Sequence, residues 1–132
     1  MVPGDPMGKE RPRVAGGHAY TPRRTAEYEA RVRLFYEAQC HHDPIPAGQA
    51  VRITIRAVFR PPERTSKARL REMMAGIRLP AKRPDWDNIG KVICDSLNGT
   101  AWHDDAQITT AHVYKRYGIE PCVEILIEED EG

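Results

Sequence analysis

The clearest pattern of polar and apolar positions lies in residues 51–59, VRITIRAVF, where Val51, Ile53 and Ile55 alternate with polar side chains. Alternation with a period of two places neighbouring side chains on opposite faces, so this segment predicts a β-strand. Two later segments, 107–117 and 122–129, also predict strands. Because only a short turn-rich stretch separates them, we expect them to pair with each other in an antiparallel hairpin.

Apolar spacing also predicts a helix over about residues 22–40, with Thr21 as its N-cap and Pro22 at its first helical position. The apolar residues that indicate this helix are Ala26, Ala30, Leu34 and Ala38.

Three further elements follow from local signals. Residues 9–20 predict a hairpin around Gly16 and Gly17, since two glycines suit a tight turn. Residues 66–76 predict a short helix whose Leu70, Met73 and Met74 point inward. A helix of about residues 88–97, with an inward stripe of Ile89, Val92 and Ile93, ends at Asn98-Gly99. Residues 1–132 are therefore expected to form a single domain of the α/β (α+β) class, a mixed sheet packed with helices.

Composition narrows the class of protein. The 132 residues are 40% hydrophobic and 30% charged, and no apolar run approaches the roughly 20 residues of a membrane-spanning helix. We expect no membrane partner and, because the N-terminus lacks the apolar segment of a signal peptide, a cytoplasmic location. The three cysteines are widely spaced, so we expect them to be reduced and partly buried.

The net charge of +1 hides an uneven distribution. Residues 1–116 hold all 20 lysines and arginines against 13 acids, a surplus of seven, whereas residues 117–132 hold six acids and no Lys or Arg. Five of the 13 acids fall within residues 85–105. This pattern suits a basic scaffold that holds a polyanion such as DNA around a cluster of carboxylates.

Candidate chemistry centres on Asp85 and Asp87. In an extended segment their side chains project to one side, and two close carboxylates repel each other unless a cation lies between them. Oxygen ligands select Mg²⁺ or Mn²⁺. If Asp87 caps the following helix, Lys91 lies beside the carboxylates, where its charge can stabilise a phosphodiester transition state. Asp104 and Asp105 are further candidate ligands. Together these residues predict a site for metal-assisted phosphodiester hydrolysis.

Each part also has a structural explanation. An Asp-x-Asp-Asn segment is often only a helix cap, and His-Asp-Asp is often a surface turn. Asp95 fits a helix-surface group better than a direct ligand, and His103 fits a charge-stabilised loop residue. Trp86 fits the core, or a lid over the site, better than a surface on which bases stack.

The two segments RPDWDNIGKVICDSLNG and AWHDDAQI resemble the signature of the RusA family of Holliday junction resolvases, and GDPMGKERPR with the following YTP resembles its opening. The resemblance implies a homodimeric, mixed α/β endonuclease that uses Mg²⁺ or Mn²⁺ to nick four-way DNA junctions symmetrically in recombination and repair. It assigns catalytic roles to Asp85, Asp87, Lys91 and Asp105, with the three acids and Asp104 as metal ligands. Trp86 departs from the aliphatic residue more common there, and the spacer before Asp104 is short.

We expect the DNA backbone to be contacted by basic residues that position it without reading its sequence. The candidates are Lys9, Arg11, Arg13, Arg23, Arg24, Lys67, Arg71, Lys82 and Arg83. A non-cleaving, branched-DNA-binding protein with a structural metal site is the alternative. A two-carboxylate glycosidase is a third hypothesis, which the basic scaffold and Lys91 disfavour.

Overall fold

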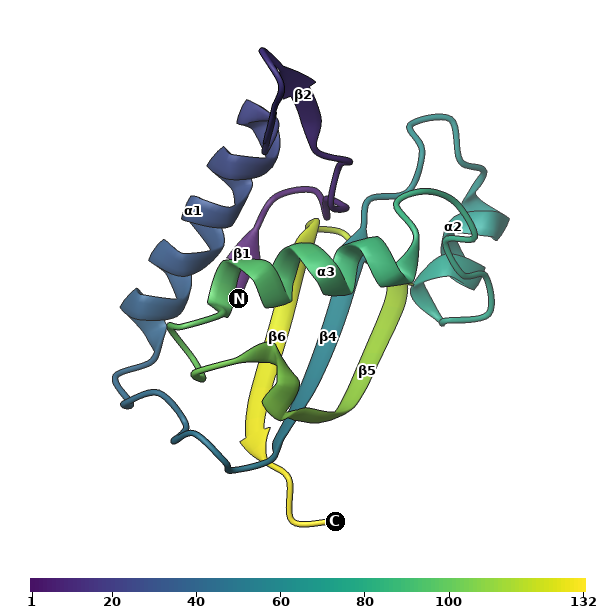
Figure 1. Cartoon of the computed structure of the whole chain (residues 1–132). Helices are drawn as coiled ribbons and strands as arrows, with labels where there is room; N and C mark the ends of the chain where they lie inside the picture. The colour runs from purple at the N-terminus through teal and green to yellow at the C-terminus, as the bar shows by residue number, and fades with distance from the viewer.

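The computed structural model describes residues 1–132, which form a mixed four-stranded sheet with two long helices over one of its faces (Figure 1). This arrangement is the α+β fold that the sequence predicts. In chain order the elements are β1 (Val2–Pro3), β2 (Arg13–Ala15), β3 (His18–Tyr20), α1 (Arg23–Gln39), β4 (Val51–Phe59), α2 (Lys67–Met74), α3 (Trp86–Leu97), the 3₁₀-helix η1 (Asp105–Gln107), β5 (Ile108–Tyr117) and β6 (Cys122–Glu129).

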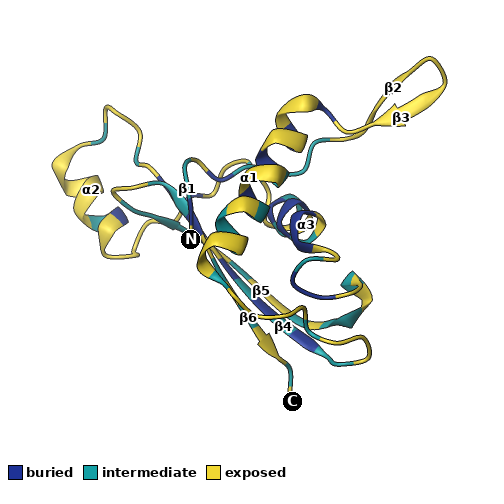
Figure 2. Cartoon of the chain, turned by 90° about the vertical axis from the view of Figure 1, so that its left-hand side faces the viewer, coloured by how far each residue is buried: buried dark blue, intermediate teal, exposed yellow.

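The strand predicted at residues 51–59 is confirmed, and it lies inside the sheet. The strand order is β1-β6-β4-β5, with β4 parallel to β5 and antiparallel to β6. Val51, Ile53, Ile55 and Ala57 of β4 are at most 1% exposed. Figure 2 shows that buried residues follow β4 and the side of α3 that faces the sheet.

The expected direct pairing of residues 107–117 with 122–129 is wrong, because β4 lies between the two strands. β4 is the more completely buried strand, so placing it inside the sheet removes more apolar surface from water. The connecting loop crosses the end of β4, where the Gly118 amide donates to the Phe59 carbonyl at 2.9 Å. A Cβ atom at Gly118 would lie 2.4 Å from Cγ1 of Val58, so this crossing requires glycine.

Helix α3 packs on the sheet through the predicted stripe, with Ile89, Val92 and Ile93 fully buried. The helix begins at Trp86, two residues earlier than predicted. Asp85 rather than Asp87 occupies the N-cap position, because the Asp85 carbonyl already accepts the first helical hydrogen bond from Ile89 at 3.0 Å.

Helix α1 also shows a shift. Pro22 rather than Thr21 is its N-cap residue, with Arg23 at the first helical position. The apolar stripe Ala26, Ala30, Leu34 and Ala38, which indicated the helix, is exposed. The buried face instead carries Thr25, Tyr28 and Val32, of which Tyr28 and Val32 belong to the hydrophobic core.

The two projecting elements are α2 and the β2–β3 hairpin, which extend from opposite ends of the molecule (Figure 2). The predicted hairpin is confirmed, and all six of its strand residues are exposed. In α2 only Met73 is buried, whereas Leu70 and Met74 are each 40% exposed, so the expected inward stripe is reduced to one residue.

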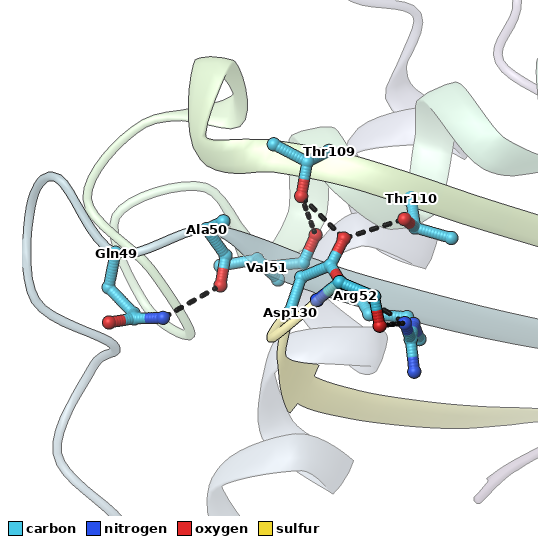
Figure 3. A network of polar contacts seen from close by, with 8 residues as sticks. Gln49, Ala50, Val51, Arg52, Thr109, Thr110 and Asp130 are labelled. Carbon is cyan, nitrogen blue, oxygen red and sulfur yellow. Dashed lines mark hydrogen bonds and ion pairs between the residues drawn. The ribbon is translucent and has the colours of Figure 1, made fainter.

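A polar network around Asp130 fastens the C-terminus to the start of the sheet (Figure 3). Its carboxylate accepts hydrogen bonds from the hydroxyls of Thr110 at 2.6 Å and Thr109 at 2.7 Å, and it pairs with Arg52 at 3.1 Å. These hydrogen bonds, with a smaller contribution from Arg52, lower the pKa of Asp130 to about 2. The first residues of β5 are thereby held against β4.

The remaining composition-based expectations concern the cysteines and membranes. All three cysteines are unpaired and half-buried. No helix in the chain combines the length and the apolar character that crossing a membrane requires.

Candidate active site

Asp85 and Asp87 lie at the N-terminus of α3, where the helix dipole favours negative charge. Asp85 has an extended backbone and its side chain makes no capping hydrogen bond. The Asp87 carboxylate accepts the Asn88 amide at 3.0 Å. Both residues are exposed, both line the same cavity, and neither forms an ion pair with a lysine or arginine. Two unneutralised carboxylates therefore share one opening.

Lys91 follows Asp87 by one helical turn on an exposed face of α3. Residues four apart are neighbours on a helix surface, so positions 87, 91 and 95 form one row, as the sequence predicted even though Asp87 is not the cap. Lys91 has no carboxylate partner within ion-pair distance. Its ammonium group is consequently free to meet an anionic ligand.

Two open cavities meet at Asp85 and Arg83. The larger, of about 700 Å³, lies between the N-terminal segment and the start of α3, and its basic side chains are Lys9, Arg11, Arg24 and Arg83. The smaller, of about 480 Å³, also contains Asp87. The acids thus lie beside a basic recess, an arrangement that attracts a polyanion toward them.

Close contact between the N-terminal segment and α3 depends on Gly8. A Cβ atom there would lie 2.9 Å from Cβ of Pro84 and 3.1 Å from Cβ of Asn88. Because glycine lacks this atom, the amide of Lys9 reaches the Asn88 carbonyl at 2.9 Å. The N-terminal segment is therefore held against the end of the helix that carries the two acids.

The Lys9 side chain is already paired within the protein. Its Nζ lies 2.7 Å from Glu29 and 3.1 Å from Asp95. Partial burial lowers the pKa of Lys9, but its bonds to the two acids outweigh burial and raise the pKa above the ordinary value. Lys9 thus joins the N-terminal segment to α1 and α3, and Asp95 serves as its partner on the surface of α3.

Asp104 and Asp105 have different surroundings. The Asp104 side chain caps η1 by accepting the Ala106 amide at 3.0 Å. Asp105 accepts the indole N–H of fully buried Trp102 at 2.8 Å. Burial raises the pKa of Asp105 despite this hydrogen bond, and the charges of Asp95 and Asp104 raise it further. Asp105 is thus a fixed carboxylate whose charge is disfavoured.

Gln107 holds this acidic loop, a role that the sequence-based interpretation missed. Its amide nitrogen donates to the carbonyls of Pro46 at 2.8 Å and Gln49 at 3.0 Å, and its amide oxygen accepts the backbone amides of His103 and Asp104. The signal was present in the sequence, because an N-cap Asp followed three residues later by Gln is the pattern of a capping box. His103 itself is an exposed loop residue.

The expected three-carboxylate metal site is not assembled in the structure. No group of three His, Cys, Asp or Glu side chains is placed to hold a metal ion. Asp105 interacts with Asp95, which lies eight residues along α3 from Asp87, a rise of about 12 Å. Asp85 and Asp87 form one pair and Asp105 a separate acid, so the full ligand set remains a prediction.

The predicted DNA-contacting residues are distributed over the molecule. Arg11, Arg24 and Arg83 line the larger cavity. Arg23 pairs with Glu27 on the exposed first turn of α1 at 2.9 Å. Lys82 lines the smaller cavity, while Arg13 lies on the hairpin and Lys67 and Arg71 on α2. A bound DNA that touches all of these groups extends from the hairpin to α2.

The contrast between the two neighbouring acids gives a testable prediction. We expect Asp105→Asn to lower phosphodiester cleavage by about a hundredfold or more if the charge acts in catalysis. Asp104→Asn changes cleavage by only a fewfold, because Asn caps helices as well as Asp does. Cleavage rates of the two variants on the same labelled DNA measure the contrast, and equal losses would contradict it.

The same variants separate activity from stability. The folded state raises the pKa of Asp105 above its unfolded value, so its ionised form destabilises the fold at neutral pH, and this penalty disappears as pH falls through the folded pKa. Thermal unfolding at pH 7 should therefore show no loss of stability in Asp105→Asn. A marked loss would assign Asp105 a structural role.

Comparison with known proteins shows relatives of this sequence. The model of the family described as Endodeoxyribonuclease RusA matches residues 3–128, which include all four of the predicted catalytic residues. A Bacillus subtilis (strain 168) protein, named Uncharacterized protein YqaN, is 31% identical over 135 residues, which cover 97% of this chain and 93% of that protein.

Proposed function

The chain belongs to the RusA family of endodeoxyribonucleases, and from this premise we propose that it resolves Holliday junctions by metal-dependent hydrolysis of paired, symmetric phosphodiester bonds. The observation that carries the proposal is the pair Asp85 and Asp87, two unneutralised carboxylates at the mouth of a basic recess. In this proposal the protein acts in the cytoplasm, in DNA recombination and repair.

The donor set fits a hard divalent cation. Asp85 and Asp87 provide carboxylate oxygens, share one cavity and form no ion pair within the protein. Carboxylate oxygens are the ligands that Mg²⁺ and Mn²⁺ prefer. These two residues would hold the ion, with Asp105 as the further ligand that the family motif predicts, while Asp104 remains the cap of η1. When bound, such an ion activates water and stabilises the leaving oxygen.

The other residues have roles that follow from charge and position. Lys91 places a positive charge one turn from Asp87, where it stabilises charge that develops on the phosphate in the transition state. Arg11, Arg24 and Arg83 line the larger cavity and hold the DNA backbone beside Asp85. None of these contacts reads sequence, so junction recognition depends on shape.

Resolution also requires two cuts. We propose that two copies of the chain form a two-fold homodimer, because a four-way junction has near two-fold symmetry and paired nicks need paired sites. The family activity provides no support for the glycosidase hypothesis. A non-cleaving, branched-DNA-binding protein remains the competing proposal.

The decisive experiment is cleavage of an end-labelled four-way junction by the purified protein, with Mg²⁺ and with EDTA. We expect symmetric nicks in two opposing strands with Mg²⁺ and none with EDTA, while junction binding persists in both. A linear duplex of the same sequence is the control substrate. Binding without nicks in Mg²⁺ or Mn²⁺ would support the non-cleaving alternative.

A further inference from the structure

Trp86 has an unusual position for a large apolar side chain. It stands between Asp85 and Asp87 and is 65% exposed, so of its two expected positions, in the core or as a lid over the site, the core is wrong. The other tryptophan, Trp102, is fully buried with its N–H bonded to Asp105. The indole N–H of Trp86 makes no hydrogen bond within the protein, and Trp86 lines the smaller cavity. An indole face is thus presented to solvent directly beside the candidate catalytic acids.

The same cavity contains two lysines that have no carboxylate partner. Lys115 Nζ lies 5.5 Å from the centroid of the Phe59 ring, and Lys82 Nζ lies 5.9 Å from the centroids of both Phe59 and Tyr117. Lys115 also donates a hydrogen bond to the Lys82 carbonyl. Neither ammonium group takes part in any ion pair.

This local arrangement selects an anion. Two ammonium groups near one aromatic ring repel each other, and the ring quadrupole attracts both without neutralising either. A phosphate in the cavity that both lysines line can neutralise them. Lys115 was not a predicted DNA contact, because a lysine in a β-strand carries no signal in the sequence and reaches the cavity only through the place of β5 in the sheet.

We propose that Trp86, Lys82 and Lys115 form a binding site for a single unstacked nucleotide, with the base on the Trp86 indole and its phosphate at the two lysines. This inference rests on the proposed function and identifies how that site selects its substrate. Bases at the branch point of a junction leave their stack more easily than bases within a duplex, and an exposed aromatic ring binds them by stacking. The subsite therefore confers preference for branched over linear DNA.

The first test compares Trp86→Leu, which removes the ring, with Trp86→Phe, which keeps one. Binding is measured by anisotropy in EDTA, on a labelled four-way junction and on a linear duplex of the same sequence. We expect Trp86→Leu to weaken junction binding roughly tenfold to a hundredfold and duplex binding by less than twofold, with Trp86→Phe retaining most of the junction affinity. Lys115→Gln weakens junction binding as well.

Tyr114→Leu is the matched control. Tyr114 is an exposed aromatic residue, 42% accessible, on the same strand as Lys115. Adjacent residues of a strand point to opposite faces of the sheet, so Tyr114 points away from the cavity. We expect its substitution to leave junction and duplex binding unchanged.

A junction carrying 2-aminopurine at the branch point tests the stacking directly. Stacking on Trp86 quenches this base in the wild-type complex, and Trp86→Leu restores its emission even at saturating protein. If the wild type binds the junction but Trp86→Leu changes neither affinity nor emission, the nucleotide site is wrong and the proposed function stands. If the wild type does not bind the junction, both are wrong.

Discussion

Asp87→Asn is expected to reduce junction cleavage by about a thousandfold or more, because a catalytic metal supplies several kcal/mol of transition-state stabilisation. Asn has nearly the same shape as Asp and still accepts the Asn88 amide hydrogen bond, so the helix start is retained. What is lost is one of the two negative charges that would hold the ion. Asp85→Asn should give a loss of the same order, since the two acids share one cavity.

Junction binding should change little in Asp87→Asn, and removal of a charge near phosphate should if anything strengthen it. Gel-shift affinity and single-turnover cleavage on one labelled junction measure the two effects separately. Asp43→Asn, a change of the same kind on an exposed loop residue, is the matched control and should cleave like the wild type. Normal cleavage by Asp87→Asn would remove the carboxylate pair from the mechanism.

Local signals predicted the elements of this fold well, because each depends on neighbours in the chain. The alternation in residues 51–59 identified β4, and the stripe of Ile89, Val92 and Ile93 identified the buried face of α3. The pairing of strands depends on burial across the whole sheet. β4 buries Val51, Ile53, Ile55 and Ala57 on the face under the helices, and Val58 and Phe59 at its end. It lies inside the sheet, between the two strands that sequence proximity alone would pair.

In the candidate site, too, local spacing predicts the position of some residues, whereas the position of others depends on the whole fold. The proximity of Asp87 and Lys91 follows from helical spacing, which the sequence contains. Asp85 and Asp87 share a cavity, although α3 begins at Trp86 and the extended segment expected to align them is not formed. The position of Asp105 depends on Trp102, whose buried indole holds it on the side of Asp95. That contact is local in the chain, but the burial of the indole depends on the whole fold. Sequence reasoning grouped the three acids, and the structure does not assemble them into one metal site. The family match covers all three acids. The cleavage rates of the Asp105 and Asp87 variants test whether these acids act in the same reaction.

Substitution of Lys91 is expected to have the second large effect on cleavage, because Lys91 supplies a positive charge that the metal-binding acids cannot. Lys91→Met keeps the length and the apolar part of the side chain but removes the ammonium group. We expect single-turnover cleavage at saturating protein to fall about a hundredfold to a thousandfold, the range observed for loss of one charge-stabilising donor, while the affinity for the junction changes by less than a few fold.

The separation of rate from affinity distinguishes Lys91 from lysines that only position the DNA. Lys67→Met on α2 removes an exposed candidate phosphate contact, so it should weaken binding and reduce its salt dependence without changing the saturated rate. Lys91 lies one turn from Asp87 and has no internal acid partner, which leaves its charge for the reacting phosphate. If Lys91→Met instead lost affinity and kept its saturated rate, Lys91 would be one more backbone contact, and transition-state charge would have to be stabilised by the metal and arginines alone.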